Sequence, residues 1–143
     1  ICFVGNNNCY FSFNFDGNIS IVVIMQLVSI SENKSVEKRI AITPEIAKKY
    51  IQLGFKLSLP NNYAKDLGYS DEEYKNLGVN ILNNEKELIS NADIIVQLGL
   101  PEKEKLSLLR ENQTLIGSLN TFLNREILEN LKSKKINCFS WNY

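Results

Sequence analysis

The sequence predicts an α/β fold in which a mostly parallel sheet lies between two layers of helices. Three observations indicate it: short apolar segments alternate with amphipathic ones, helix-start signals recur between them, and DIIVQLG (93–99) is almost wholly apolar. Strands that alternate with helices pair in parallel, and a strand buried on both faces carries a continuous apolar run. Right-handed crossovers then put helices on both faces, which is a three-layer, flavodoxin-like arrangement.

The predicted strands are short apolar runs bounded by turn residues. In chain order they are 25–31, 55–59, 79–82, 93–99, 113–119 and 136–141. Cys138 lies in the last apolar run, and we expect it to be a small core residue.

The predicted helices begin at capping residues. Thr43 is the expected N-cap of the first helix, with Pro44 at its first position and Gly54 as its stop signal. Its inward face is predicted to carry Ile46, Ala47, Tyr50 and Leu53.

The second helix is predicted from the capping pair Ser70 and Glu73 and ends at Gly78. Three more helices are expected at 84–91, after Pro101, and at 124–135. Their predicted inward residues are Leu88, Ile89, Leu106, Leu109, Ile127, Leu128 and Leu131.

Residues 1–24 differ from the rest of the chain. They contain no Lys or Arg, since the first basic residue is Lys34, and Met25 is the only methionine. A secretory signal needs a positive start, so these residues are a poor signal peptide. We therefore divide the chain into an extension, 1–24, and a domain, 25–143, with the hypothesis that the native chain begins at Met25.

Composition excludes several classes of function. The chain has 143 residues, 16 basic and 16 acidic side chains, three cysteines and no histidine. Balanced charge argues against a nucleic-acid partner. The absence of histidine and of any CxxC pair argues against a metal site. No GxG motif or GxSxG elbow occurs, so we predict no catalytic, cofactor-binding or metal-ligating residue within this chain.

Ligands of open parallel sheets bind beyond the carboxyl ends of the strands. At those ends we expect Arg39 after the first strand, Gln97 in the fourth and Asn120 after the fifth. These three are the candidate ligand-facing residues, because a guanidinium can hold a carboxylate or phosphate with two hydrogen bonds. The alternative is that Arg39 only ties its own loop to Glu32 or Glu37 as an ion pair.

Several blocks of the chain resemble the N-terminal domain of the alanine dehydrogenase/pyridine nucleotide transhydrogenase family. The signature Arg-Ile-Ala-Ile-Thr-Pro (39–44) and Leu-Gly-Phe-Lys-Leu (53–57) match in order and spacing. So do GYSDEEYKNLGVNIL (68–82), ADIIVQLGLP (92–101) and NQTLIGSLNTFLNREILENLKSKKIN (112–137). The segment PNNYAKDLG (60–68) departs from the Gly-Ala-Gly loop that is usual in this family.

The resemblance implies roles for the three candidates. In alanine dehydrogenases the signature Arg and a Lys hold the substrate carboxylate, and a His is the acid/base. Arg39 matches, whereas Gln97 stands at the Lys position and Asn120 at the His position. Alanine oxidation by that mechanism is therefore not expected. Transhydrogenase alpha subunits need no such His, because hydride passes directly between two nicotinamides. Many of them keep a basic residue at the position of Gln97, so this chain departs from them there as well.

The resemblance therefore favours an N-terminal fragment of a proton-translocating NAD(P) transhydrogenase alpha subunit. It implies NAD(H) and NADP(H) in the full complex, with neither bound by the fragment alone. The implied partners are the Rossmann half of the same subunit, the membrane transhydrogenase subunits and a second copy of the full-length subunit. The implied location is cytoplasmic, at the inner membrane through partners and without direct insertion. The alternatives are an amino-acid dehydrogenase domain of the alanine or saccharopine type, or a non-catalytic binding domain.

Overall fold

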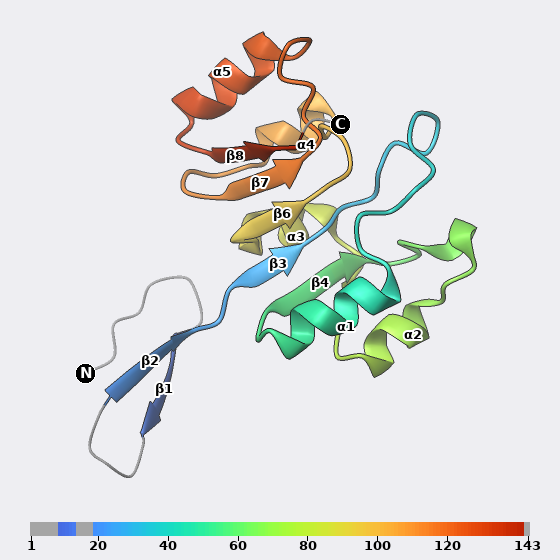
Figure 1. Cartoon of the computed structure of the whole chain (residues 1–143), viewed down its shortest axis with the longest axis vertical. Helices are drawn as coiled ribbons and strands as arrows, with labels where there is room; N and C mark the ends of the chain where they lie inside the picture. Colours follow the sequence, from blue (N-terminus) through green and yellow to red (C-terminus); the bar gives the residue numbers. More distant parts are fainter. Residues whose placement is uncertain (1–8, 14–18, 142–143) are drawn as a thin grey trace.

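A computed structural model describes residues 9–13 and 19–141 of the chain. Its centre is a six-stranded parallel sheet with the order β5-β4-β3-β6-β7-β8 (Figure 1). The strands are β3 (Gln26–Val28), β4 (Lys56–Pro60), β5 (Asn80–Leu82), β6 (Ile94–Val96), β7 (Thr114–Gly117) and β8 (Asn137–Ser140). The predicted α/β class with a parallel sheet is confirmed, and each strand lies within or overlaps a predicted one.

The chain winds outward from β3 in two directions. It first runs through β4 to β5, then crosses back over the sheet and continues through β6 and β7 to β8. Counted from β3, the strand order is 3-2-1-4-5-6, a doubly wound order that reverses between β3 and β6. At such a reversal the loops leave neighbouring strands in opposite directions, so a crevice opens beyond the carboxyl ends of β3 and β6.

The α-helices lie where they were expected, and the first two begin directly after their predicted capping residues. They are α1 (Pro44–Gln52), α2 (Asp71–Asn76), α3 (Glu85–Asn91), α4 (Lys103–Ser107) and α5 (Arg125–Ser133), with a 3₁₀ turn, η1, at Lys65–Leu67. The Thr43 and Ser70 side chains accept from the backbone N–H groups of Ile46 and Glu73. Gly54 and Gly78 follow α1 and α2 with φ angles of 91° and 92°, a conformation that favours glycine.

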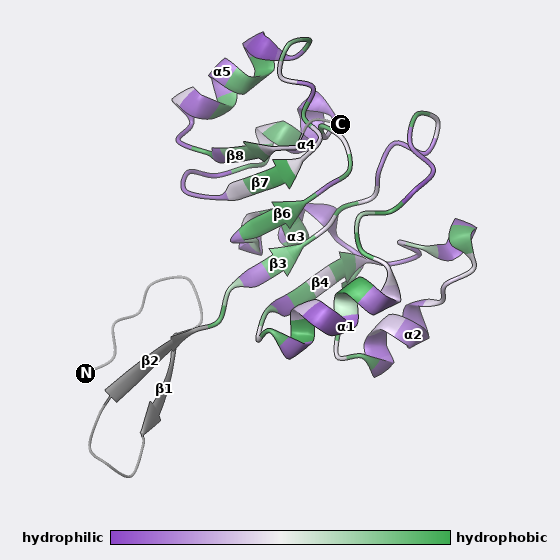
Figure 2. Cartoon of the chain, in the orientation of Figure 1, coloured by the Kyte–Doolittle hydropathy of each residue, from purple (hydrophilic) through white to green (hydrophobic). Residues whose placement is uncertain are grey.

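Helices cover both faces of the sheet, and each covered face forms a buried cluster. On one face, α1 and α2 pack through Ala47 and Tyr74 against β3 and β4. On the other face, α3, α4 and α5 pack through Leu88, Leu106 and Leu131 into a second cluster, with α3 beside β3 and β4 and α5 beside β8. Figure 2 shows hydrophobic residues concentrated in the central strands, while the helices are striped between hydrophobic and hydrophilic.

Two predicted core residues are exposed, so those predictions were wrong. Cys138 is exposed because β8 is the edge strand, and all four residues of β8 are exposed. Leu53 is 72% exposed because it is the C-cap of α1, beyond the last turn that packs on the sheet. Apolar patterning identified both segments correctly, but it does not reveal which strand lies at the edge or where a helix stops packing.

Residues 9–13 and 19–23 form a separate antiparallel pair, β1 (Cys9–Phe13) and β2 (Ile19–Val23), which does not join the six-stranded sheet. Other residues of the predicted 1–24 extension, 1–8 and 14–18, lie outside the described part of the chain. The division at Met25 stays a prediction.

Candidate functional site

The crevice at the topological switch point is the candidate site. The loops that follow β3, β6 and β7 meet there, because these three strands are neighbours in the sheet. A hollow of about 400 Å³ lies beyond the strand ends, and Glu32, Gln97 and Asn120 are among the residues that line it. A second hollow of about 290 Å³ adjoins it, and the two share Ser31, Glu32 and Glu37.

Gln97 is buried at the centre of this arrangement, with 1% of its surface exposed. Its Oε1 accepts hydrogen bonds from the Ser29 hydroxyl and the Ile30 N–H, both at 2.8 Å. A backbone N–H can only donate, so the atom beside Ile30 must be the amide oxygen. Nε2 therefore points the other way and donates to Glu32 Oε1 at 3.1 Å. Both ends of the amide are engaged within the chain.

Glu32 spans the crevice from the loop after β3 to the loop after β6. Its Oε1 also accepts from the Leu98 N–H at 2.6 Å, and the Gly99 N–H is a further donor to this carboxylate. Burial raises the pKa of Glu32, and the backbone donors of Leu98 and Gly99 oppose that shift. Glu32 is therefore a partly buried carboxylate held by several donors, at the place where an anionic ligand would need the same donors.

A line of buried hydrogen bonds joins the crevice to the signature segment 39–44. The Tyr63 hydroxyl lies 2.8 Å from Ser29 Oγ and accepts from the Ile42 N–H at 3.2 Å, while the Tyr74 hydroxyl donates to the Ile42 carbonyl at 2.9 Å. Because the Ser29 proton goes to Gln97, Tyr63 donates to Ser29. Burial raises the pKa of Tyr63 to about 12. The signature segment and the crevice are thus one hydrogen-bonded unit.

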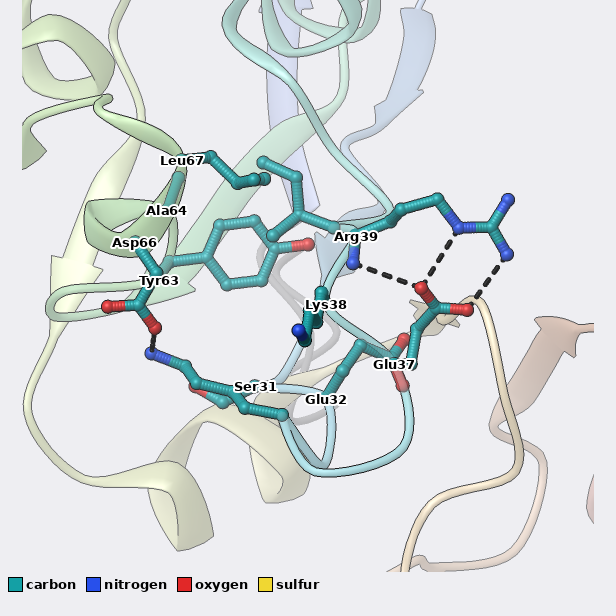
Figure 3. Close-up of a pocket in the computed structure, with 11 residues that line it drawn as sticks. Ser31, Glu32, Glu37, Lys38, Arg39, Tyr63, Ala64, Asp66 and Leu67 are labelled. Atoms are coloured by element: carbon teal, nitrogen blue, oxygen red, sulfur yellow. Dashed lines mark hydrogen bonds and ion pairs between the residues drawn. The ribbon is translucent and has the colours of Figure 1, made fainter.

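Arg39 lies at the rim of the smaller hollow, and its side chain is 76% exposed. Its Nε and one terminal nitrogen donate to the two carboxylate oxygens of Glu37 at 2.9 and 2.8 Å (Figure 3). These bonds hold the pKa of Glu37 at about 2. The alternative in which Arg39 pairs within its own loop is observed, with Glu37 as the partner. Tyr63, Lys34 and Asp66 line the same hollow, and Lys34 pairs with Asp66.

The structure brings two of the three predicted residues to the same hollow. Gln97 lies at its inner wall, and Asn120 is exposed at its mouth in a left-handed conformation, with φ at 46°. Arg39 lines the neighbouring hollow instead. The ligand-facing role of all three stays a prediction.

Sequence reasoning missed Ser29 and Tyr63. Ser29 is a polar residue inside an apolar strand, and that was a usable signal, because a buried hydroxyl has to find a partner. Tyr63 lies in the segment 60–68 that departs from the family pattern, and nothing local to it indicates that its hydroxyl is buried.

The described residues do not fit the dinucleotide that the resemblance implies. A pyrophosphate is held by backbone N–H groups of a glycine-rich turn. Here the loop after β3 carries Glu32, and this carboxylate takes the N–H groups of Leu98 and Gly99. Within the described ranges, no group of three His, Cys, Asp or Glu side chains could hold a metal ion.

Curated relatives carry names from both branches of one family. An NAD(P) transhydrogenase subunit alpha protein of Rickettsia prowazekii is 29% identical over 83% of this chain and 32% of its own length. The transhydrogenase alpha subunit of Cereibacter sphaeroides is 36% identical over 68% of this chain and 19% of its own. Alanine dehydrogenase 1 of Staphylococcus aureus is 26% identical over 81% and 31%. The chain thus spans about a third or less of these relatives.

Solved structures share the fold. An L-alanine dehydrogenase superposes with a TM-score of 0.75 at 20% identity, covering 81% of this chain and 32% of that protein. A transhydrogenase from Sinorhizobium meliloti superposes with a TM-score of 0.71 at 21% identity, covering 79% and 34%. The model of the family described as alanine dehydrogenase/PNT, N-terminal domain, matches residues 29–143. The chain therefore belongs to the alanine dehydrogenase/PNT N-terminal domain family.

Proposed function

We propose that the chain is the N-terminal domain of an NAD(P) transhydrogenase alpha subunit. In the complete complex, hydride would pass from NADH to NADP⁺ coupled to proton movement, and this domain would form one wall of the cleft beside the NAD-binding half. The names of the relatives from Rickettsia prowazekii and Cereibacter sphaeroides support this, the second at the higher identity of 36%.

The hydrogen-bonded state of Gln97 is the observation that carries the proposal. Its amide is neutral, and its hydrogen bonds go to Ser29, Ile30 and Glu32. It stands where the resemblance implies the carboxylate-binding Lys of alanine dehydrogenases, and Asn120 stands where it implies the acid/base His. An amide is not a proton acceptor at neutral pH, so neither residue supplies acid/base catalysis. Direct hydride transfer between two nicotinamides needs no such group.

The proposal includes partners and location. A Rossmann half of the same subunit would bind NAD(H). An NADP(H)-binding domain would accept the hydride, and membrane-embedded subunits would carry the protons. The full-length subunit would pair with a second copy. The complex would place this domain at the cytoplasmic side of the inner membrane. In the described part of the chain, no helix is long and apolar enough to cross a membrane.

An amino-acid dehydrogenase domain is the second candidate. The match to alanine dehydrogenase 1 of Staphylococcus aureus and the superposition on an L-alanine dehydrogenase favour it. It would require the crevice to bind a substrate carboxylate despite the carboxylate of Glu32.

A chimeric protein distinguishes the transhydrogenase function from the amino-acid dehydrogenase function. The chain is joined to the remaining two thirds of the Rickettsia prowazekii relative, and the product is combined with that organism's membrane subunits. We expect NADH-dependent reduction of an NADP⁺ analogue and no alanine-dependent reduction of NAD⁺. The control is the unaltered relative in the same membranes. Alanine turnover at an enzymatic rate, without transhydrogenation, would refute the proposal.

A further inference from the structure

The larger hollow at the switch point carries more negative than positive charge. Its lining includes the carboxylates of Glu32, Glu37 and Glu102 and one ammonium, that of Lys105. Arg39 offsets Glu37, and Lys105 is itself paired with Glu85 at 3.2 Å. Among the described residues Glu32 and Glu102 form no close ion pair, and the charge of Lys105 also acts on Glu32.

The donors at the end of β6 are already used. The loop after β6 presents three donors in a row, Gln97 Nε2 and the N–H groups of Leu98 and Gly99, and all three point to the Glu32 carboxylate. A ligand carboxylate would have to displace Glu32 from these donors. It would also approach a like charge at contact distance, and such an approach is costly.

Two neutral groups also remain open at the hollow. The Ser118 hydroxyl and the Asn120 side-chain amide both line it, and neither side chain makes a hydrogen bond to another described residue. Both can accept or donate hydrogen bonds, whereas the lone pairs of Glu32 that its donors leave free can only accept them. The hollow therefore presents an acceptor-only carboxylate beside two neutral groups that adapt to either a donor or an acceptor.

We propose that Glu32 is the specificity-determining residue of this hollow, which takes a cationic N–H-bearing group of the amidinium or ammonium type and rejects a carboxylate. The inference is independent of the proposed transhydrogenase function, because it rests only on the charges and donors of the crevice. It reverses the preference expected of a crevice that binds substrate carboxylates.

Three planar probes of nearly equal shape test this: acetamidinium, acetamide and acetate, with charges of plus one, zero and minus one. Each is titrated into the full chain at constant ionic strength while the N–H signals of Leu98, Gly99, Ser118 and Asn120 are followed by NMR. We expect saturable shifts at Ser118 and Asn120 with acetamidinium. Its affinity should exceed that of acetate by at least about tenfold, which corresponds to roughly 1.4 kcal/mol.

Two substitutions assign the effect to Glu32. Glu32→Gln keeps the side-chain shape and removes the charge, so the preference for acetamidinium should disappear. Glu32→Ala also leaves the N–H groups of Leu98 and Gly99 without their acceptor, so acetate should now shift the NMR signals of these two groups. Glu45→Gln is the matched control: it removes an exposed carboxylate from the first turn of α1, which lines neither hollow, and should leave the preference intact.

Three outcomes would overturn the inference. They are equal or tighter binding of acetate by the unaltered chain, no local shift with acetamidinium, and an unchanged preference in Glu32→Gln. The last result would leave Glu32 as a brace between two loops and nothing more. Glu32→Gln keeps the shape of the original side chain, so the test does not depend on Glu32→Ala remaining folded.

Discussion

Replacing Gln97 with glutamate tests the hydrogen-bonded centre of the crevice with a change of almost no volume. Oε1 of the new side chain can still accept from Ser29 and Ile30. The other end changes from a donor to an acceptor, opposite Glu32 Oε1 at a position that is 3.1 Å away in the native chain. Two carboxylates then face each other in a site that is 1% exposed at residue 97.

The folded variant can respond in two ways: both carboxylates stay ionised and repel each other, or one of them keeps a proton. The loss of unfolding free energy is the smaller of the two costs. Two unit charges about 3 Å apart repel by about 5 kcal/mol at an effective dielectric constant of about 20. Keeping one proton on the pair instead costs about 1.4 kcal/mol for each pH unit above the ordinary Glu pKa of about 4.3, or about 3 to 4 kcal/mol at about pH 7. The smaller cost decides, so we expect Gln97→Glu to lose about 3 to 4 kcal/mol of unfolding free energy at about pH 7.

The pH dependence has a definite sign. Between roughly pH 4.3 and 7 the folded variant holds a proton that the unfolded chain releases, so the variant gains stability as pH falls. The deficit relative to the native chain should shrink to about 1 kcal/mol at about pH 5. In the native chain Glu32, whose pKa is raised, changes stability in the same direction, so the quantity to compare is the difference between the two proteins.

Urea unfolding at several pH values measures this difference, provided that the slope of free energy against urea is unchanged. Gln52→Glu is the control, because Gln52 is exposed at the end of α1 and the same chemical change there should stay within about 0.5 kcal/mol. A variant as stable as the native chain at about pH 7, or a deficit that does not depend on pH, would refute the arrangement around Gln97.

Three further predictions concern the scaffold of the crevice, and urea unfolding measures each. A Cβ on Gly117 would lie 2.7 Å from the carbonyl oxygen of Gln97, so Gly117→Ala should destabilise the chain by more than about 1 kcal/mol, and no loss would mean that β6 and β7 can separate. Tyr63→Phe removes the acceptor of a buried N–H and should cost about 1 to 3 kcal/mol, whereas Tyr69→Phe, at a residue that is 38% exposed, should cost almost nothing. Leu115→Ala in the fully buried centre of β7 should cost about 2 to 5 kcal/mol, and a smaller loss would contradict its place in the core.

Local patterns in the sequence were sufficient to predict the elements of this fold. Thr43 with Pro44, and Ser70 with Glu73, mark helix starts through bonds made within a few residues, and both starts are observed. The apolar run at 93–99 predicted a strand buried on both faces, and β6 is a central strand. Such signals can be recognised in the sequence because they depend only on residues that are close together in the chain.

Only the tertiary structure could decide which of these residues meet. The sequence indicated that Arg39, Gln97 and Asn120 follow strand ends, but whether a side chain there meets solvent or another chain segment depends on contacts across the sheet. Arg39 donates hydrogen bonds to Glu37, two residues away, whereas Gln97 forms hydrogen bonds with Ser29 and Glu32, more than sixty residues away.

Sequence alone thus determined the class of fold, the order of its strands and helices, and the family. The tertiary structure decided that Cys138 lies on an edge strand, that Tyr63 and Ser29 join the signature segment to the crevice, and that the Glu32 carboxylate fills the donors at the switch point. The physical reason is that periodicity and capping are local, whereas the burial of a polar group is resolved by whichever partners the folded chain brings within hydrogen-bonding distance.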